Sequence, residues 1–128
     1  MSNYQHSDVT EKIIKAYYKV YNKLGYGFLE KVYENAMMIE LKKSGFESNT
    51  QLPIKVFYEE EEVGYYVADI IVDRKVIIEI KAAECLQEEH EVQLINYLRA
   101  TDIEVGLLIN FGKKAEFKRK VFSNEFKK

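Results

Sequence analysis

Apolar positions recur at helical spacing over the first third of the chain. They lie three or four residues apart over residues 9–24 and again over residues 28–41, with Gly25 and Gly27 between the two segments. Gly45 then supplies the stop expected just beyond a helix end. The pattern predicts two consecutive helices.

From residue 51 the pattern changes to runs rich in β-branched and aromatic residues. Three such runs predict strands, at Leu52–Tyr58, Tyr65–Val72 and Val76–Ile80. The acidic stretch Glu59–Glu62 is expected to form the first turn and Asp73–Lys75 the second, which gives an antiparallel meander. The third run, VIIEI, is apolar around a single charge, as is typical of a central strand covered on both faces.

Residues 88–100 return to helical spacing, and the run VGLLINF at Val105–Phe111 then reads as a further strand. A strand, a helix and another strand form a right-handed crossover, so this strand is expected to lie parallel to the third one. Residues 113–122 alternate loosely and fit either an edge strand or a short helix. The order ααβββαβ predicts an α/β fold, with a mixed sheet between layers of helices.

Composition favours one compact unit. The chain has 128 residues, of which 47% are hydrophobic, and residues 1–128 are expected to form a single domain. One cysteine excludes an internal disulfide, and the absence of a signal-like start or of an apolar run near ~18 residues favours a cytoplasmic protein with no membrane contact. The net charge of −2 offers no general attraction for a polyanion, so a basic tail at residues 113–128 or a metal would have to supply it.

Charged residues interrupt two of the predicted core strands. Glu79 and Lys81 are two residues apart and share one face of the third strand, and Asp69 lies within the second. A three-residue loop between these strands would pair Val72 with Val76 and place Asp69 opposite Glu79, whereas a two-residue loop would separate the acids. We expect the three-residue loop. A structural Glu79–Lys81 pair at a strand end remains the alternative to a functional cluster.

Two carboxylates held together in a partly dry site repel each other, and a divalent cation relieves that repulsion. Mg²⁺, or Mn²⁺ in its place, suits two carboxylates, the backbone carbonyl of Ile80 and several waters. The ammonium of Lys81 would orient a water nucleophile and stabilise charge on a pentavalent phosphorus. This set therefore suggests phosphodiester hydrolysis.

The order Asp69, Glu79, Ile80, Lys81, after an acid-bearing helix and before a crossover helix, resembles the signature of the PD-(D/E)xK nuclease superfamily. Within it the chain resembles the GxxExxY proteins over a core of about residues 9–112, and the motif itself lies at residues 27–33 (GFLEKVY). The resemblance implies a restriction-endonuclease-like αβα sandwich. It also implies metal ligation by Asp69 and Glu79, a catalytic Lys81 and an acid from the preceding helix, Glu30.

The segment QLINY is similar to the QxxxY motif of the exonuclease-type branch of that superfamily. Gln93 and Tyr97 share one face of the predicted helix, and His90 lies on the same stripe. By the resemblance, Gln93 and Tyr97 help to position nucleic acid or support the acids. The alternative is a core Tyr97 and a solvated His90. Glu34 and Glu40, on the second helix, are expected to be solvated.

Three functions compete. The first is a magnesium-dependent nuclease acting on DNA or RNA. The second is a nuclease-fold module that binds nucleic acid or assembles with protein but has little turnover, which the near-neutral charge supports. The third is a hydrolase of small phosphate esters. Because small nuclease domains often pair to reach two strands, a homodimer is also an expectation.

Overall fold

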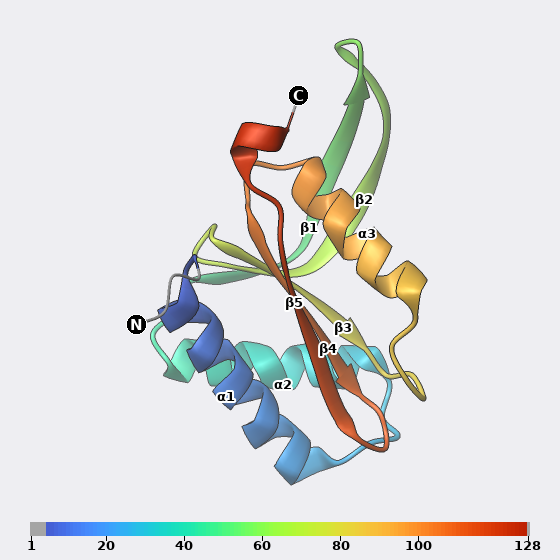
Figure 1. The fold of residues 1–128 in the computed structure, drawn as a ribbon. Coiled ribbons are helices and arrows are strands. Elements are labelled where there is room, and N and C mark those ends of the chain that lie inside the picture. The colour runs from blue at the N-terminus through green and yellow to red at the C-terminus, as the bar shows by residue number, and fades with distance from the viewer. Residues whose placement is uncertain (1–4, 128) are drawn as a thin grey trace.

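The computed structural model describes residues 5–127 (Figure 1). The helices and strands follow the order predicted from the hydrophobic pattern, and one strand is added near the C-terminus. In chain order they are α1 (Ser7–Leu24), α2 (Glu30–Lys43), β1 (Ser48–Tyr58), β2 (Glu61–Val72), β3 (Val76–Lys81), α3 (Glu88–Arg99), β4 (Val105–Phe111), β5 (Ala115–Val121) and a short 3₁₀ helix (Asn124–Phe126).

The five strands form one mixed sheet in the order β1-β2-β3-β4-β5. β3 is central and pairs in parallel with β4, while the other neighbours are antiparallel. Helices α1 and α2 cover one face of the sheet, and α3, the crossover helix, covers the other (Figure 1). The predicted α/β architecture and the parallel crossover are thus confirmed. The ambiguous segment near residue 115 is an edge strand.

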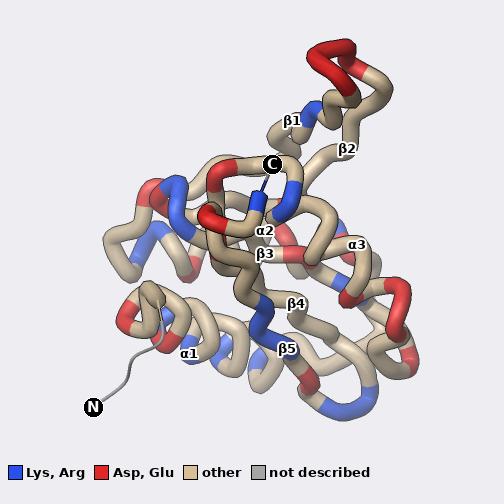
Figure 2. The backbone as a smooth tube through the Cα atoms, turned by 45° about the horizontal axis from the view of Figure 1, so that its top comes forward, with Lys and Arg blue, Asp and Glu red and all other residues tan. Residues whose placement is uncertain are grey.

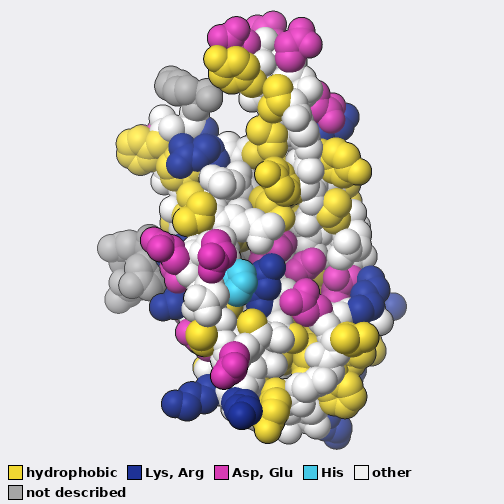
Figure 3. Space-filling view, turned by 90° about the vertical axis from the view of Figure 1, so that its right-hand side faces the viewer, with side chains coloured by type: hydrophobic (Ala, Val, Ile, Leu, Met, Phe, Trp, Pro, Cys, Tyr) yellow, Lys and Arg dark blue, Asp and Glu magenta, His cyan; other side chains and the backbone are white. Residues whose placement is uncertain are grey.

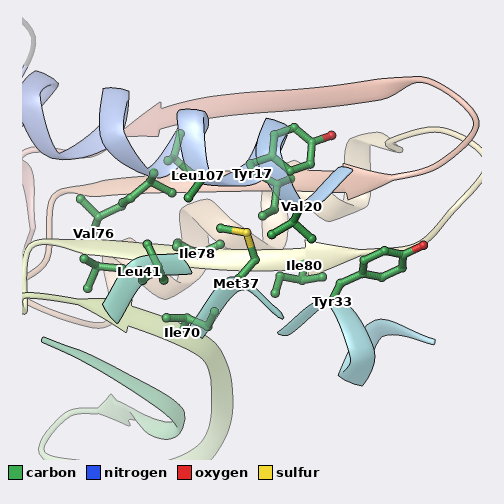
Figure 4. Packing of buried hydrophobic residues seen from close by; sticks show 14 of the residues in the cluster. Tyr17, Val20, Tyr33, Met37, Leu41, Ile70, Val76, Ile78, Ile80 and Leu107 are labelled. Carbon is green, nitrogen blue, oxygen red and sulfur yellow. The ribbon is translucent and has the colours of Figure 1, made fainter. Parts of the chain in front are cut away.

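The larger apolar core fills the space between the sheet and helices α1 and α2. Figure 4 shows its centre, where Tyr17 of α1 and Tyr33 and Met37 of α2 pack over the strands, all fully buried. Tyr33 stacks on Phe111 of β4 with ring centroids 4.0 Å apart. A second cluster lies under α3 and includes Leu94. β3 is therefore covered on both faces, as its apolar run predicted. In the described part of the chain, no helix is both long and apolar enough to cross a membrane.

The two hairpin turns differ from each other. Val72 pairs with Val76, which confirms the three-residue loop, and Asp73 and Arg74 adopt positive φ within it. The first turn is tighter than predicted, because β2 already begins at Glu61 and only two residues connect the strands. Both of them, Glu59 and Glu60, have positive φ (49° and 72°), as a two-residue hairpin with strongly twisted strands requires.

β1 and β2 bend together where Gln51 faces Asp69. Pairing between these strands continues on both sides, but this one pair is missing, and Gln51 has a φ of 53°. β2 pairs with β3 only as far as Ile70 and Ile78. Beyond the bend the two strands leave the sheet as a two-stranded arm, residues 52–68, which runs beside α3 (Figure 1). Asp69 therefore lies where two strands of the sheet diverge.

Candidate active site

The two acids lie side by side at the point of divergence. The backbone N–H of Asp69 donates to Glu79 Oε2 at 2.9 Å, and the backbone N–H of Ile80 donates to Asp69 Oδ2 at 2.8 Å. Each strand thus gives a backbone donor to the other strand's carboxylate, in place of the ladder bonds that end at Ile70 and Ile78. This reciprocal pair fixes both side chains to the sheet. The predicted juxtaposition of Asp69 and Glu79 is present.

Burial makes these carboxylates unusual. Glu79 is 4% exposed, and this burial, with the nearby charge of Asp69 as a second cause, raises its pKa to about 8. Burial likewise raises the pKa of Asp69, although the hydrogen bond from Ile80 opposes the increase. Across residues 5–127, neither acid has a salt-bridge partner, and Asp69 Oδ1 and Glu79 Oε1 accept no hydrogen bond from the protein. The site therefore concentrates acid groups without compensating ion pairs.

Lys81 follows Glu79 on the same strand and, by the alternation of β3, points to the same side as Glu79. Its side chain is half-buried and forms no salt bridge with any described residue. The positive charge is still felt by both acids, because it offsets part of the increase that burial causes in their pKa values. Glu79 and Lys81 form no ion pair in the described structure, so the pair expected under the structural alternative is not present.

The loop before α2 brings a third acid, Glu30, to the end of β3. Its Oε2 accepts a hydrogen bond from the Ala82 backbone at 3.3 Å. The Tyr33 hydroxyl secures the loop by donating to the Gly25 carbonyl at 2.8 Å and accepting from the Phe28 N–H at 3.2 Å. Gly27, with a φ of 106°, adopts a backbone conformation that side chains disfavour. The residues of the GxxExxY motif thus act together to place Glu30 beside β3.

The expectation that Glu34 is solvated was wrong. It is 4% exposed, it pairs with Lys31 at 2.8 Å, and its Oε1 accepts a hydrogen bond from Gln51 Nε2 at 2.8 Å. Its charge is close enough to contribute, after burial, to the raised pKa of Asp69. Gln51 reaches it from the bend in β1, which the sequence pattern did not reveal. Glu34 is thus a buried acid on α2 whose charge acts on Asp69.

Glu40 was also expected to be solvated, and the structure shows a mostly buried side chain. It forms salt bridges with Lys19 at 3.2 Å and with Lys43 at 3.7 Å. The contact with Lys19 joins α1 to the C-terminal half of α2, and the contact with Lys43 lies within α2. Glu40 is therefore a packing residue between two helices.

Helix α3 presents the remaining predicted residues. The Tyr97 hydroxyl accepts a hydrogen bond from Gln93 Nε2 at 2.9 Å, so the two residues form one unit. Burial raises the pKa of Tyr97 to about 12, and the charges of Glu79 and Asp69 contribute to the increase. His90 has a local role, because its Nδ1 accepts the Gln87 N–H at 3.0 Å and caps the start of α3.

Asn110 supports the site and was not singled out from the sequence. It pairs with Lys81 in the parallel ladder and is fully buried. Its amide donates to the Ala83 carbonyl and accepts from the Ala83 N–H, each at 2.9 Å. The chain that follows Lys81 is thereby held at a fixed position. The signal that could have revealed it is a lone amide side chain within the apolar run VGLLINF.

The donor set of the two acids suits a hard divalent cation. Mg²⁺ accepts one or two carboxylates, keeps several waters and tolerates a backbone carbonyl. Residues 5–127 contain no group of three or more His, Cys, Asp or Glu side chains arranged to hold a metal, so water would complete the coordination. Two acids with raised pKa values, each with one carboxylate oxygen that accepts no hydrogen bond from residues 5–127, fit that limited set of protein ligands.

The fold and this cluster of acids together define the class of protein. A mixed sheet lies between helices, and two acids lie side by side where β2 and β3 diverge, with a lysine two residues further along β3, as in a restriction-endonuclease-like nuclease fold. The chain belongs to the PD-(D/E)XK nuclease superfamily, whose family model matches residues 7–120.

A solved structure, the crystal structure of SSO0001, has a similar fold. The TM-score is 0.58 at 20% sequence identity, and the match covers 91% of this chain and 59% of that chain. The present chain thus spans about 59% of the length of that protein, and the likeness concerns the fold alone. A search of curated proteins gave no match.

Proposed function

We propose that this protein is a nuclease that uses Mg²⁺ or Mn²⁺ to hydrolyse phosphodiester bonds in DNA or RNA. The supporting observation is the reciprocal pair of backbone hydrogen bonds that holds the Asp69 and Glu79 carboxylates together, each with one free oxygen. Such acids, close together and without ion-pair partners among the described residues, are suited to bind a cation that also binds phosphate oxygens. Membership of the nuclease superfamily supports the same function.

In this proposal Asp69, Glu79 and the carbonyl of Ile80 hold the cation. When bound, the metal would supply Lewis acidity toward the scissile phosphate and toward water. The sheet keeps both carboxylates in place, because each accepts a hydrogen bond from the opposite strand. The protein therefore needs little reorganisation on binding the ion.

Lys81 would act on the substrate directly. Its ammonium has no salt-bridge partner among residues 5–127, so it is free to donate to the attacking water or to a phosphate oxygen. Glu30 reaches the end of the same strand and would accept a hydrogen bond from the attacking water. Asn110 fixes the backbone that follows Lys81 and is a positioning residue.

Gln93, Tyr97 and His90 would contact the substrate strand from helix α3. The Gln93–Tyr97 hydrogen bond orients the phenol near the acids. His90 uses Nδ1 to cap the helix, which leaves Nε2 for a nucleic-acid contact. These three residues also line a pocket of about 340 Å³ beside α3.

Within the superfamily, we infer that the chain is a GxxExxY protein. The motif residues Gly27, Glu30 and Tyr33 form one structural unit that carries the acid to β3. A single compact domain over residues 1–128 with the site at its sheet fits this assignment.

The test is a cleavage assay on labelled single- and double-stranded DNA and RNA, with Mg²⁺, Mn²⁺ or a chelator. Asp69→Asn and Lys81→Met are expected to lower the cleavage rate by about 100-fold or more. Asp102→Asn and Lys75→Met change the same residue types at exposed positions and serve as matched controls. Circular dichroism verifies that every variant is folded.

The result that contradicts the proposal is metal-independent cleavage, or equal rates for the site variants and their controls. If no nucleic acid is cut and Mg²⁺ does not stabilise the protein, the alternative of a binding module without turnover is favoured. Cleavage confined to small phosphate esters would identify the third function instead.

A further inference from the structure

The arm and helix α3 enclose a groove that leads away from the two acids. Two pockets, of about 410 Å³ and about 340 Å³, lie along it and share Tyr66, Asn96 and Tyr97 as lining residues. Because they share these side chains, the pockets adjoin. Tyr97 packs in the apolar cluster under α3 with Ala68 and Ile77, which lie one and two residues from Asp69 and Glu79 on their strands, so the groove lies beside the candidate active site and continues along the arm.

Aromatic rings form one wall of this groove. Tyr66 of β2 is 52% exposed, and its ring centroid lies 5.6 Å from that of the buried Tyr97. Phe57, 59% exposed, lines the larger pocket further along the arm. Figure 3 shows hydrophobic side chains along the length of the arm. Exposed rings with buried support offer flat faces on which planar groups can stack.

The charge inside the groove favours an anionic ligand. Arg99 lines the larger pocket from α3, and no Asp or Glu is among the lining residues of that pocket. Arg99 is held in place by stacking over the ring of Phe122, 4.6 Å from its centroid. Lys55 also borders this pocket, but it pairs with Tyr65 across the strands, so its side chain leaves the arm on the face away from Tyr66. The smaller pocket contains one acid, Glu89, together with the amides of Gln93 and Asn96.

Acidic residues at the tip of the arm limit how far along the groove this ligand can bind. Glu59, Glu60, Glu61 and Glu62 are all exposed there, and Figure 2 shows them as one acidic cap. A phosphate backbone would be repelled by this cap. The anionic ligand is therefore expected to occupy the groove between the candidate active site and the cap, without passing the tip.

We propose that this groove binds unpaired nucleotides of a single-stranded nucleic acid, with bases stacked on Tyr66 and Phe57 and phosphates near Arg99. The inference rests on the proposed nuclease function and adds the substrate class. Pockets of this volume accommodate ligand-sized groups and are too small for a double helix. Bases in a duplex are also covered by their neighbours and cannot stack on a protein ring.

The test measures binding without cleavage. Fluorescence anisotropy is recorded at low salt, with a chelator present, on a labelled single strand of about 12 nucleotides and on the matching duplex. Tyr66→Ala is expected to weaken single-strand binding by roughly 5- to 150-fold, the range for loss of one stacked base. Tyr66→Phe keeps the ring and should bind nearly as well as the original protein.

Tyr65→Ala is the matched control. Tyr65 is the neighbouring residue on β2, is 63% exposed and lines neither pocket. Its side chain points to the opposite face of the arm, so its removal should leave the affinity within about twofold. Thermal unfolding followed by circular dichroism confirms that both alanine variants are folded.

The outcomes separate this inference from the proposed function. Equal single-strand affinities of Tyr66→Ala and Tyr65→Ala would contradict single-strand binding in the groove, even if Asp69→Asn abolishes cleavage. Equal affinities of the protein for duplex and single strand would contradict it as well. If single-strand affinity depends on Tyr66 but the protein cleaves no nucleic acid, the proposed binding in the groove is supported and the proposed nuclease activity is contradicted. If Tyr66→Ala instead disrupts a dimer in sedimentation and leaves single-strand binding unchanged, the groove is an interface between two copies.

Discussion

Replacing Glu79 by glutamine should remove the pH dependence of stability that this side chain causes. The pKa of Glu79 is raised from 4.5 to about 8, mainly by burial and then by the charge of Asp69. Between these two pH values the folded protein keeps a proton that the unfolded chain has released, so the free energy of unfolding falls as pH rises. Glutamine has no proton to release, and its amide oxygen still accepts the Asp69 N–H.

The size of the effect follows from linkage. Stability decreases by about 1.4 kcal/mol for each pH unit between the unfolded and the folded pKa, with a ceiling of about 5 kcal/mol for the full interval. The stabilising contribution is complete below pH 4.5 and lost as pH approaches 8. Glu79→Gln should therefore match the original protein at about pH 4.5 and exceed its stability by several kcal/mol at about pH 8.5.

Urea unfolding with a chelator present, followed by circular dichroism from about pH 5 to about pH 9, measures this difference. Glu11→Gln, at an exposed position of α1, is the control for the same exchange outside the site. Mg²⁺ at high pH should restore stability to the original protein and not to Glu79→Gln. Parallel pH curves for the original protein and Glu79→Gln would refute the electrostatic description of the site.

Two further changes test the supports of the site. Asn110→Ala removes both hydrogen bonds to Ala83, and urea unfolding should show a loss of about 0.5–1.5 kcal/mol for each of them, whereas an unchanged midpoint would contradict that role. Gly106→Ala would place a Cβ 2.7 Å from Leu94 Cδ1, so the packed Leu94 side chain or α3 itself must move, and the melting temperature should fall by several degrees. Gly64→Ala, with no neighbour within 4 Å, is its control and should melt close to the original protein.

Much of the fold could be predicted because local patterns determined it. Helical spacing located both N-terminal helices, and the apolar VIIEI run indicated the central strand between two helical layers. The register at Val72 and Val76 followed from the length of one loop. Since side chains alternate along a strand, that single register also brought Asp69 and Glu79 together.

The remaining features depend on contacts between distant segments. The bend at Gln51 has no sequence signal, and it is this bend that brings a side-chain partner to Glu34. Without that partner, a glutamate on a helix is reasonably expected in water. The arm beside α3, with Tyr66 against Tyr97, arises from the same bend. A hairpin pattern alone predicts two strands but not the direction in which they leave the sheet.

Anomalous diffraction from crystals soaked in Mn²⁺ tests the central claim most directly. A single strong peak between Asp69 Oδ1 and Glu79 Oε1, the two carboxylate oxygens without protein donors in the described structure, is the predicted result. Metal–oxygen distances of about 2.0–2.2 Å to both carboxylates would accompany it. A map with no peak at these oxygens, at a manganese concentration that supports cleavage, would contradict the account.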